Sequence, residues 1–136
     1  MTFSNLSITI FNMLTLKLVT DKNEISNLYK DFSIEDNANG VHFLFLDDEK
    51  PIGFIRFILK DNYALIDKIY YVDGVEEGDK DFFLRSTLFK FQDASILLKL
   101  EGDQKDFYKF GFVYEDGYTQ IWSPNINLHG GCSSHN

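Results

Sequence analysis

Two hydrophobic periods alternate along this chain, and their order constrains its fold more than any other feature. Residues 14–19 alternate with a period of two, which predicts a strand. Residues 21–32 begin with capping-box spacing and continue with apolar side chains at i, i+3, i+4 and i+7, which predicts an amphipathic helix. Residues 41–46 and 52–59 flank a polar turn, and this pattern is typical of a β-hairpin.

The second half of the chain continues the same alternation. Residues 63–72 are almost continuously apolar, so we expect a central strand that is covered on both faces. Downstream of it the patterns predict a helix, a short buried strand, a short helix that ends at a glycine, and a hairpin with an Asp-Gly turn, at 80–92, 95–100, 103–110 and 112–122. The order β-α-β-β-β-α-β-α-β-β predicts one α/β (α+β) unit with a mixed central sheet.

Net charge and cysteine content limit the classes of function. A formal net charge of −8 argues against a nucleic-acid surface and against binding to an anionic membrane. It is compatible with a cationic partner, although solubility alone also explains it. The single cysteine excludes an internal disulfide and favours a reducing compartment, so we expect a cytoplasmic protein.

Three segments resemble motifs of the GNAT superfamily, the acyl-CoA N-acyltransferase-like proteins. Residues 50–56, Lys-Pro-Ile-Gly-Phe-Ile-Arg, are similar to the family's hairpin entry into its third strand. Residues 69–85 resemble its cofactor-binding strand, loop and helix, and residues 106–112, Asp-Phe-Tyr-Lys-Phe-Gly-Phe, resemble its aromatic-Tyr-x-x-Gly-Phe signature. The resemblance covers residues 13–122 and implies a GNAT-like mixed sheet.

The same resemblance divides the chain and suggests what it binds. We expect a GNAT-like N-acetyltransferase domain at 13–122, an N-terminal extension at 1–12 and a flexible tail at 123–136. The turn at 37–40 leaves no room for the family's second helix, so the acceptor cleft should be unusually open. The implied reaction uses acetyl-CoA as co-substrate and acetylates a primary amine of a small molecule or peptide. The oligomeric state stays open, a homodimer included.

The cofactor loop is where this sequence departs from the family. GNAT proteins hold the diphosphate of acetyl-CoA on loop amides at a helix start, where free N–H groups and the helix dipole favour an anion. The resemblance implies cofactor contacts at Tyr71, Val72, Gly78, Asp79, Lys80 and Phe107. The backbone groups of Tyr71 and Val72 would pair with the pantetheine arm. Acidic residues crowd this loop, at Asp73, Glu76, Glu77, Asp79 and Asp81.

Two interpretations of the acidic loop remain open. One is a weakened cofactor site, in which Lys80 supplies a compensating cation or the enzyme uses a different acyl-CoA. The other is an acid-rich helix start that holds no ligand. The corresponding functions are an N-acetyltransferase and a catalytically inactive GNAT-like binding module.

Three side chains are candidates for acid–base chemistry. Tyr108 matches the family tyrosine that often protonates the departing thiolate. Asp67 lies in an apolar strand, where an ionised group needs a partner or a function. It is a candidate base, or it pairs with Arg56 across the hairpin. Glu101, where the family often has Asn, could act as a base through water.

Other polar side chains suggest weaker sites. The spacing His129-x-x-Cys132-x-x-His135 offers three soft metal ligands, but it lies in a Gly/Ser-rich tail without a fourth ligand, so we expect no metal site. His42, on an alternating strand, is interpreted as a packed or surface histidine.

Overall fold

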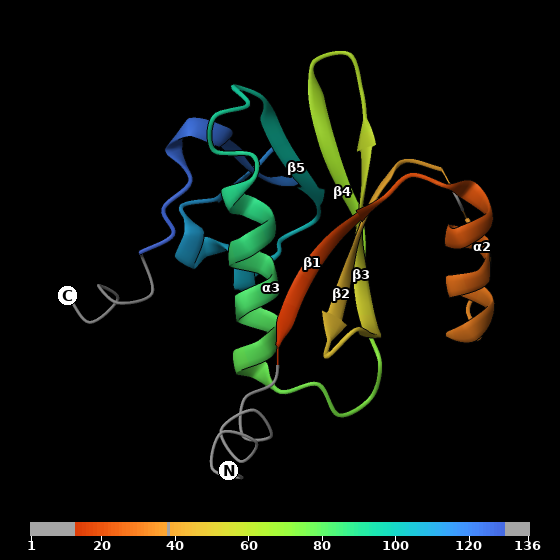
Figure 1. The fold of residues 1–136 in the computed structure, drawn as a ribbon. Coiled ribbons are helices and arrows are strands. Elements are labelled where there is room, and N and C mark those ends of the chain that lie inside the picture. The colour runs from red at the N-terminus through yellow and green to blue at the C-terminus, as the bar shows by residue number, and fades with distance from the viewer. Residues whose placement is uncertain (1–12, 38, 130–136) are drawn as a thin grey trace, which may run out of the picture.

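The computed structural model describes residues 13–37 and 39–129. It contains seven strands, two α-helices and two short 3₁₀ helices (Figure 1). In chain order these are β1 (Leu14–Val19), α2 (Lys22–Asp31), β2 (Val41–Asp47), β3 (Lys50–Leu59), β4 (Tyr63–Tyr71), α3 (Glu77–Phe89), β5 (Leu97–Glu101), η1 (Lys105–Phe110), β6 (Val113–Glu115), β7 (Tyr118–Trp122) and η2 (Ser123–Asn125). The predicted order of elements is confirmed.

One sheet forms the centre of the molecule, with the strand order β1-β2-β3-β4-β5-β7-β6. Helix α3 lies on one face and α2 on the other (Figure 1). The larger hydrophobic core lies on the α3 face and includes Phe45, Phe57, Phe83 and Phe110. Alternating side chains place the smaller core on the opposite face.

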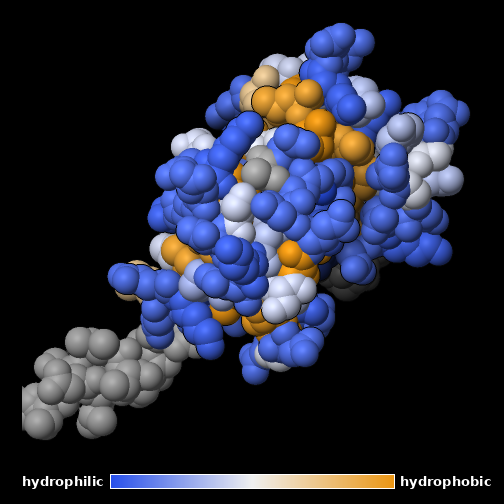
Figure 2. Space-filling model, turned by 90° about the vertical axis from the view of Figure 1, so that its right-hand side faces the viewer, coloured by the Kyte–Doolittle hydropathy of each residue, from blue (hydrophilic) through white to orange (hydrophobic). Residues whose placement is uncertain are grey.

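Helix α2 covers only part of its face of the sheet. Its buried residues, Ile25 and Tyr29, pack with Val19, Leu44 and Phe54 from the first three strands. Between α2 and β2 the described residues contain no helix. Seen from the α2 side, the surface is mostly hydrophilic, with a hydrophobic area near the top of the view (Figure 2). Among the described residues no further helix covers this face, and β4 meets α2 where Tyr70 packs on Phe32 at the end of the helix.

The start of α2 differs in detail from the predicted capping box. The Asp21 carboxylate accepts a hydrogen bond from the backbone N–H of Asn23 at 2.9 Å, as a helix cap does. Glu24, the expected second member of the box, instead forms an ion pair with Lys17 on β1 at 3.2 Å. Asp21 therefore caps the helix, while Glu24 connects it to the neighbouring strand.

Strand β4 is central, as predicted, but it is not covered on both faces. Beyond Ile66 its residues are exposed or half-buried, because β4 and β5 pair only from Tyr63↔Leu97 to Leu65↔Lys99 and then separate. In the pairing with β3, Arg56 lies opposite Lys68 and the next pair skips Asp67. Asp67 is thus the additional residue of a β-bulge, a feature that bends a strand away from its neighbour.

The C-terminal part also differs from expectation. The short helix at 105–110 is 3₁₀, and it ends at Gly111 with φ +99°. The tail expected to be flexible from 123 begins with an ordered turn, in which Ser123 is buried and Ile126 is 5% exposed against the larger core. Residues 1–12 and 130–136 lie outside the described residues. No described helix is long and apolar enough to span a bilayer.

Candidate functional site

The separation of β4 from β5 opens a cleft of about 360 Å³, which we call the splay cleft. Its lining residues are Ile66, Asp67, Lys68, Ile69, Leu100, Glu101 and Gln104. Beyond Leu65 the edge of β4 that faces β5 has no partner strand in the described part of the chain, so backbone groups along it are open to a ligand. The fold thus places peptide groups and two carboxylates around one opening.

A second cleft of about 290 Å³ adjoins the first, and we call it the helix cleft. It lies between β4, the start of α3, and η1, and it is lined by Ile69, Tyr71, Glu77, Lys80, Asp81, Leu84, Gln104, Asp106, Phe107 and Lys109. Ile69 and Gln104 line both clefts, so the two form one continuous groove. The groove runs from the centre of the sheet to the start of α3.

Asp67 projects from the bulge onto Arg56. Both carboxylate oxygens accept hydrogen bonds from the guanidinium, at 2.8 Å from Nε and 2.9 Å from Nη2. The Arg56 side chain is 7% exposed and that of Asp67 25%. The hydrogen bonds that Arg56 donates to Asp67 raise the pKa of the guanidinium. The pairing of Asp67 with Arg56 is confirmed, and it engages both oxygens of the carboxylate.

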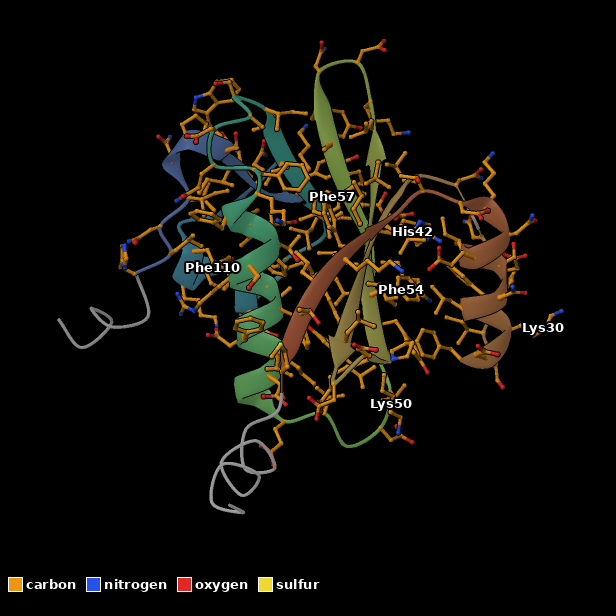
Figure 3. All side chains as sticks on the ribbon, in the orientation of Figure 1. Lys30, His42, Lys50, Phe54, Phe57 and Phe110 are labelled. Atoms are coloured by element: carbon orange, nitrogen blue, oxygen red, sulfur yellow. The ribbon has the colours of Figure 1, made fainter. Side chains whose placement is uncertain are left out.

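The same guanidinium continues into a buried polar network beneath α2. Arg56 Nη1 donates to the Tyr29 hydroxyl at 2.9 Å, and that hydroxyl lies 2.8 Å from His42 Nε2. His42 is 2% exposed and lies beside Phe54 on the α2 side of the sheet (Figure 3). Burial lowers the pKa of His42, with a further contribution from Arg56. His42 is therefore a packed histidine, as interpreted from the sequence.

The other two candidate catalytic residues lie in different places. Glu101 is exposed at the end of β5 and lines the splay cleft together with Asp67. Tyr108 is 42% exposed and lines neither the splay cleft nor the helix cleft. Its hydroxyl donates a short hydrogen bond to Asp103, which raises the pKa of the phenol. The structure therefore brings Asp67 and Glu101 together and leaves Tyr108 apart from them.

The acidic loop divides its charges between two clefts. Asp73, Glu76 and Asp79 line a third, loop-side cleft of about 320 Å³, which also includes Asp47 and Lys50. Glu77 and Asp81 face the helix cleft instead. The acids therefore do not all line the same cleft.

The start of α3 is not capped by a side chain. Glu76 occupies the N-cap position without a side-chain hydrogen bond to the helix. Gly78 is exposed in the first turn, and a methyl group added there would meet no atom within 4 Å. The predicted cofactor residue Asp79 follows it and donates its backbone N–H to Glu76 O at 3.1 Å.

Tyr71, at the end of β4, and Val72, just after it, were predicted to bind the pantetheine arm through their backbone groups. The two residues differ in whether these groups are free to bind a ligand. The backbone N–H of Val72 donates to Ile52 O at 2.9 Å, so this donor is already paired, and the expected contact of Val72 stays a prediction. Because neighbouring residues of a strand direct their backbone groups to opposite sides, those of Tyr71 face away from β3 and toward the groove. The Tyr71 ring stacks on Phe45 at 5.5 Å, and burial raises the pKa of its hydroxyl.

Phe107 is one of the residues that line the helix cleft. It is 4% exposed and packs against Phe110 and Phe112 in the larger core. Its ring therefore forms a wall of the groove.

Sequence reasoning missed a cluster of charged residues that connects α3 to η1. Asp81 accepts from Arg85 Nε at 2.6 Å and lies 2.7 Å from Lys109 Nζ. Burial opposes ionisation of Asp81, but the bonds from Lys109 and Arg85 outweigh it and lower the pKa of this carboxyl. The i, i+4 spacing of Asp81 and Arg85 was a usable signal. Nothing local to Lys109 indicates its contact with α3.

The predicted absence of a metal site stays a prediction. Of the three possible ligands in the tail, only His129 lies within the described residues. Within residues 13–37 and 39–129, no three histidine, cysteine or acidic side chains are arranged to hold an ion.

Comparison with known proteins identifies the fold through structure alone. No protein-family model matches the sequence, and a comparison with curated proteins found no significant match. Solved structures do match. An E. coli protein described as a candidate N-acetyl transferase, bound to coenzyme A, is 15% identical with a TM-score of 0.57. The match covers 81% of this chain and 98% of that one.

Two further structures agree. A GNAT family acetyltransferase from Brucella melitensis in complex with acetyl-CoA has a TM-score of 0.58 at 14% identity, over 82% of this chain and 89% of that one. An acyl-CoA N-acyltransferase from Pseudomonas aeruginosa has a TM-score of 0.56 at 14% identity, over 81% and 97%. The chain therefore has the GNAT fold, and the predicted mixed sheet and resemblance are confirmed at that level.

Proposed function

We propose that this protein is a cytoplasmic N-acetyltransferase that transfers the acetyl group of acetyl-CoA to a primary amine of a small molecule or peptide. The observation that carries the proposal is the groove formed by the splay cleft and the helix cleft. It exposes the unpaired edge of β4 next to two carboxylates, and it leads to an uncapped helix start. Structural neighbours of the same fold contain coenzyme A or acetyl-CoA, which supports the choice of co-substrate.

The reaction requires two proton transfers. The neutral amine attacks the thioester carbonyl carbon, the C–S bond then breaks, and the acetyl group becomes an amide. Glu101 is the proposed base, which takes the proton of the attacking amine directly or through water. Among the described residues no cation lies within ion-pair distance of its carboxylate, whereas Arg56 occupies that of Asp67. We assign Asp67 the role of fixing the bulge rather than of a base.

The thiolate that leaves needs a proton, and Tyr108 is the proposed donor. A phenol is protonated at neutral pH, and the hydrogen bond to Asp103 raises the pKa of Tyr108 further. Because Tyr108 lines neither the splay cleft nor the helix cleft, it must leave Asp103 and turn toward the groove before it can reach the sulfur. The backbone of Tyr71 would pair with the pantetheine arm as an added strand does, which requires no particular side chain.

The first test measures the melting temperature during a titration with acetyl-CoA. A ligand that binds only the native state raises this temperature. We expect a rise that saturates with concentration, and no rise at millimolar acetyl-CoA would contradict the proposal. In the second step, Glu101→Gln should lower kcat with an amine panel by roughly a hundredfold and leave the acetyl-CoA shift in place. Glu115→Gln, an exposed acid on β6, is the control that should retain wild-type turnover.

One observation favours the inactive binding module as the second candidate. Four acids line the loop-side cleft with Lys50 as its one cation, and each carboxylate near a diphosphate disfavours it by roughly 1 kcal/mol in water. This alternative predicts no thermal shift with acetyl-CoA. The titration therefore separates the two functions.

A further inference from the structure

Two lysines from separate elements line the helix cleft. Lys80 lies in the first turn of α3, and Lys109 lies in η1. Their side chains are 33% and 41% exposed, so both ammonium groups remain accessible to a ligand from solvent. The fold thus places two cations at the end of the groove where α3 begins, beside the carboxylates of Glu77, Asp81 and Asp106.

Lys109 is held by a carboxylate that already has another partner. Asp81 binds Lys109 through Oδ1 and Arg85 through Oδ2. Arg85 also donates to the carbonyl of Leu128, which fixes its position. Because Arg85 alone balances the charge of Asp81, Lys109 can leave this carboxylate without leaving it unpaired.

Lys80 is also weakly held. Its ammonium lies 3.3 Å from Glu77 Oε2, a carboxylate whose side chain is 91% exposed. Exposed pairs of this kind contribute little to stability and exchange partners readily. The same ammonium lies 5.2 Å from the centre of the Tyr71 ring, which keeps it over the cleft.

The cleft also holds an unused hydrogen-bond donor. The Tyr71 hydroxyl is buried and has no hydrogen-bond partner among the described residues. A buried polar group without a partner costs stability unless a ligand or water completes it. Tyr71 thus adds a donor to the two ammonium groups in the same cleft.

We propose that the helix cleft is an anion subsite in which the ammonium groups of Lys80 and Lys109 bind the phosphate groups of acyl-CoA. This inference rests on the proposed function, and it explains how the protein would bind the phosphates of acyl-CoA although the loop is acidic. The amides at the start of α3 lie beside Glu76 and Asp79, so side-chain cations supply the attraction that the loop lacks. On binding, Lys109 exchanges Asp81 for phosphate, and Arg85 retains Asp81.

The test compares two lysines of the same short helix. Lys109→Met removes the proposed ligand, and Lys105→Met removes an equal charge from a side chain that is 76% exposed and lines neither the splay cleft nor the helix cleft. CoA affinity is measured by NMR titration, which follows the amides of the cleft and confirms that each variant is folded. We expect Lys109→Met to weaken CoA binding roughly tenfold or more relative to Lys105→Met. Lys80→Met, measured in parallel, should weaken it similarly.

The outcomes separate this inference from the proposed function. If the wild type binds CoA and both lysine variants bind it as Lys105→Met does, the subsite is wrong and the proposed function stands. If the cleft amides of the wild type do not respond to CoA, both are overturned. A response to inorganic pyrophosphate without one to CoA would indicate a site for a free phosphate and would also overturn both.

Discussion

Arg56 connects the splay cleft to the interior of the protein. It is 6% exposed and donates to Asp67, Tyr29 and the carbonyl of Asn37. A buried cation is tolerated only when such acceptors replace water. The network therefore holds the bulge of β4 from the α2 side of the sheet. It also brings a positive charge close to His42.

The buried His42 makes the stability of the protein depend on pH. Burial lowers its pKa below the ordinary 6.5 in the folded state, so the unfolded chain binds the extra proton first. The free energy of unfolding should fall as pH drops below about 6.5, by up to about 1.4 kcal/mol per pH unit, and level off below the folded-state pKa. Urea unfolding between pH 7.5 and 5 measures this slope. His42→Gln, which retains a hydrogen-bond partner for Tyr29, should flatten it, and an unchanged slope would contradict the assignment.

The candidate site could be predicted only where side-chain contacts follow from strand pairing. The Asp67–Arg56 pair was foreseeable because adjacent strands of a hairpin place their side chains together. The position of Tyr108 was not. In a 3₁₀ helix, residues i and i+3 share a face, so Phe107 and Phe110 are both buried and Tyr108 and Lys109 remain outside. The partner of Lys109 lies on another element, and no local pattern reports it.

At the scale of single elements, one glycine in β3 and one in α3 differ in whether the structure has room for a side chain. A Cβ on Gly53 would lie 2.2 Å from the backbone oxygen of Tyr70, so β3 and β4 approach too closely there for a side chain. Gly78, in the first turn of α3, has open space around it.

These two glycines give a matched pair of substitutions. Gly53→Ala should lower the free energy of unfolding by about 1–3 kcal/mol, because β3 must move away from β4. Gly78→Ala should raise it by about 0.5–1 kcal/mol, since alanine favours the helix. Chemical denaturation of both variants measures the effects. A neutral Gly53→Ala would show that the strands can separate without cost.

The elements themselves were predicted better than their surroundings. Hydrophobic period located every strand and both α-helices, although α3 begins at Glu77 rather than at 80. Its first turn consists of acids and a glycine, so no apolar repeat marks it. The apolar content of β4 suggested cover on both faces. Whether β4 is covered on both faces depends on where β5 separates from it. That separation is set by the pairing of the two strands and cannot be read from the sequence of β4 alone.

At the scale of the whole molecule, the folded unit extends beyond the sheet. The Ser123 hydroxyl accepts a hydrogen bond from the backbone N–H of Ile96 at 2.9 Å, and Ile126 packs in the larger core. A chain that ends after residue 122 should therefore melt well below the full chain. Loss of the Ile126 side chain alone, in Ile126→Ala, should cost about 2–4 kcal/mol. Equal melting of the full chain and of the chain that ends after residue 122 would refute this boundary.

Only three residue pairs join β4 to β5, so a short seam connects two parts of the seven-stranded sheet. The first contains β1 to β4 with α2, and the second contains β5, β7 and β6. A chain divided in the segment between α3 and β5 would yield two polypeptides, each with its own set of paired strands. The proposed active groove exists only where they meet, so recovered enzymatic turnover would report the reassembly of the two halves.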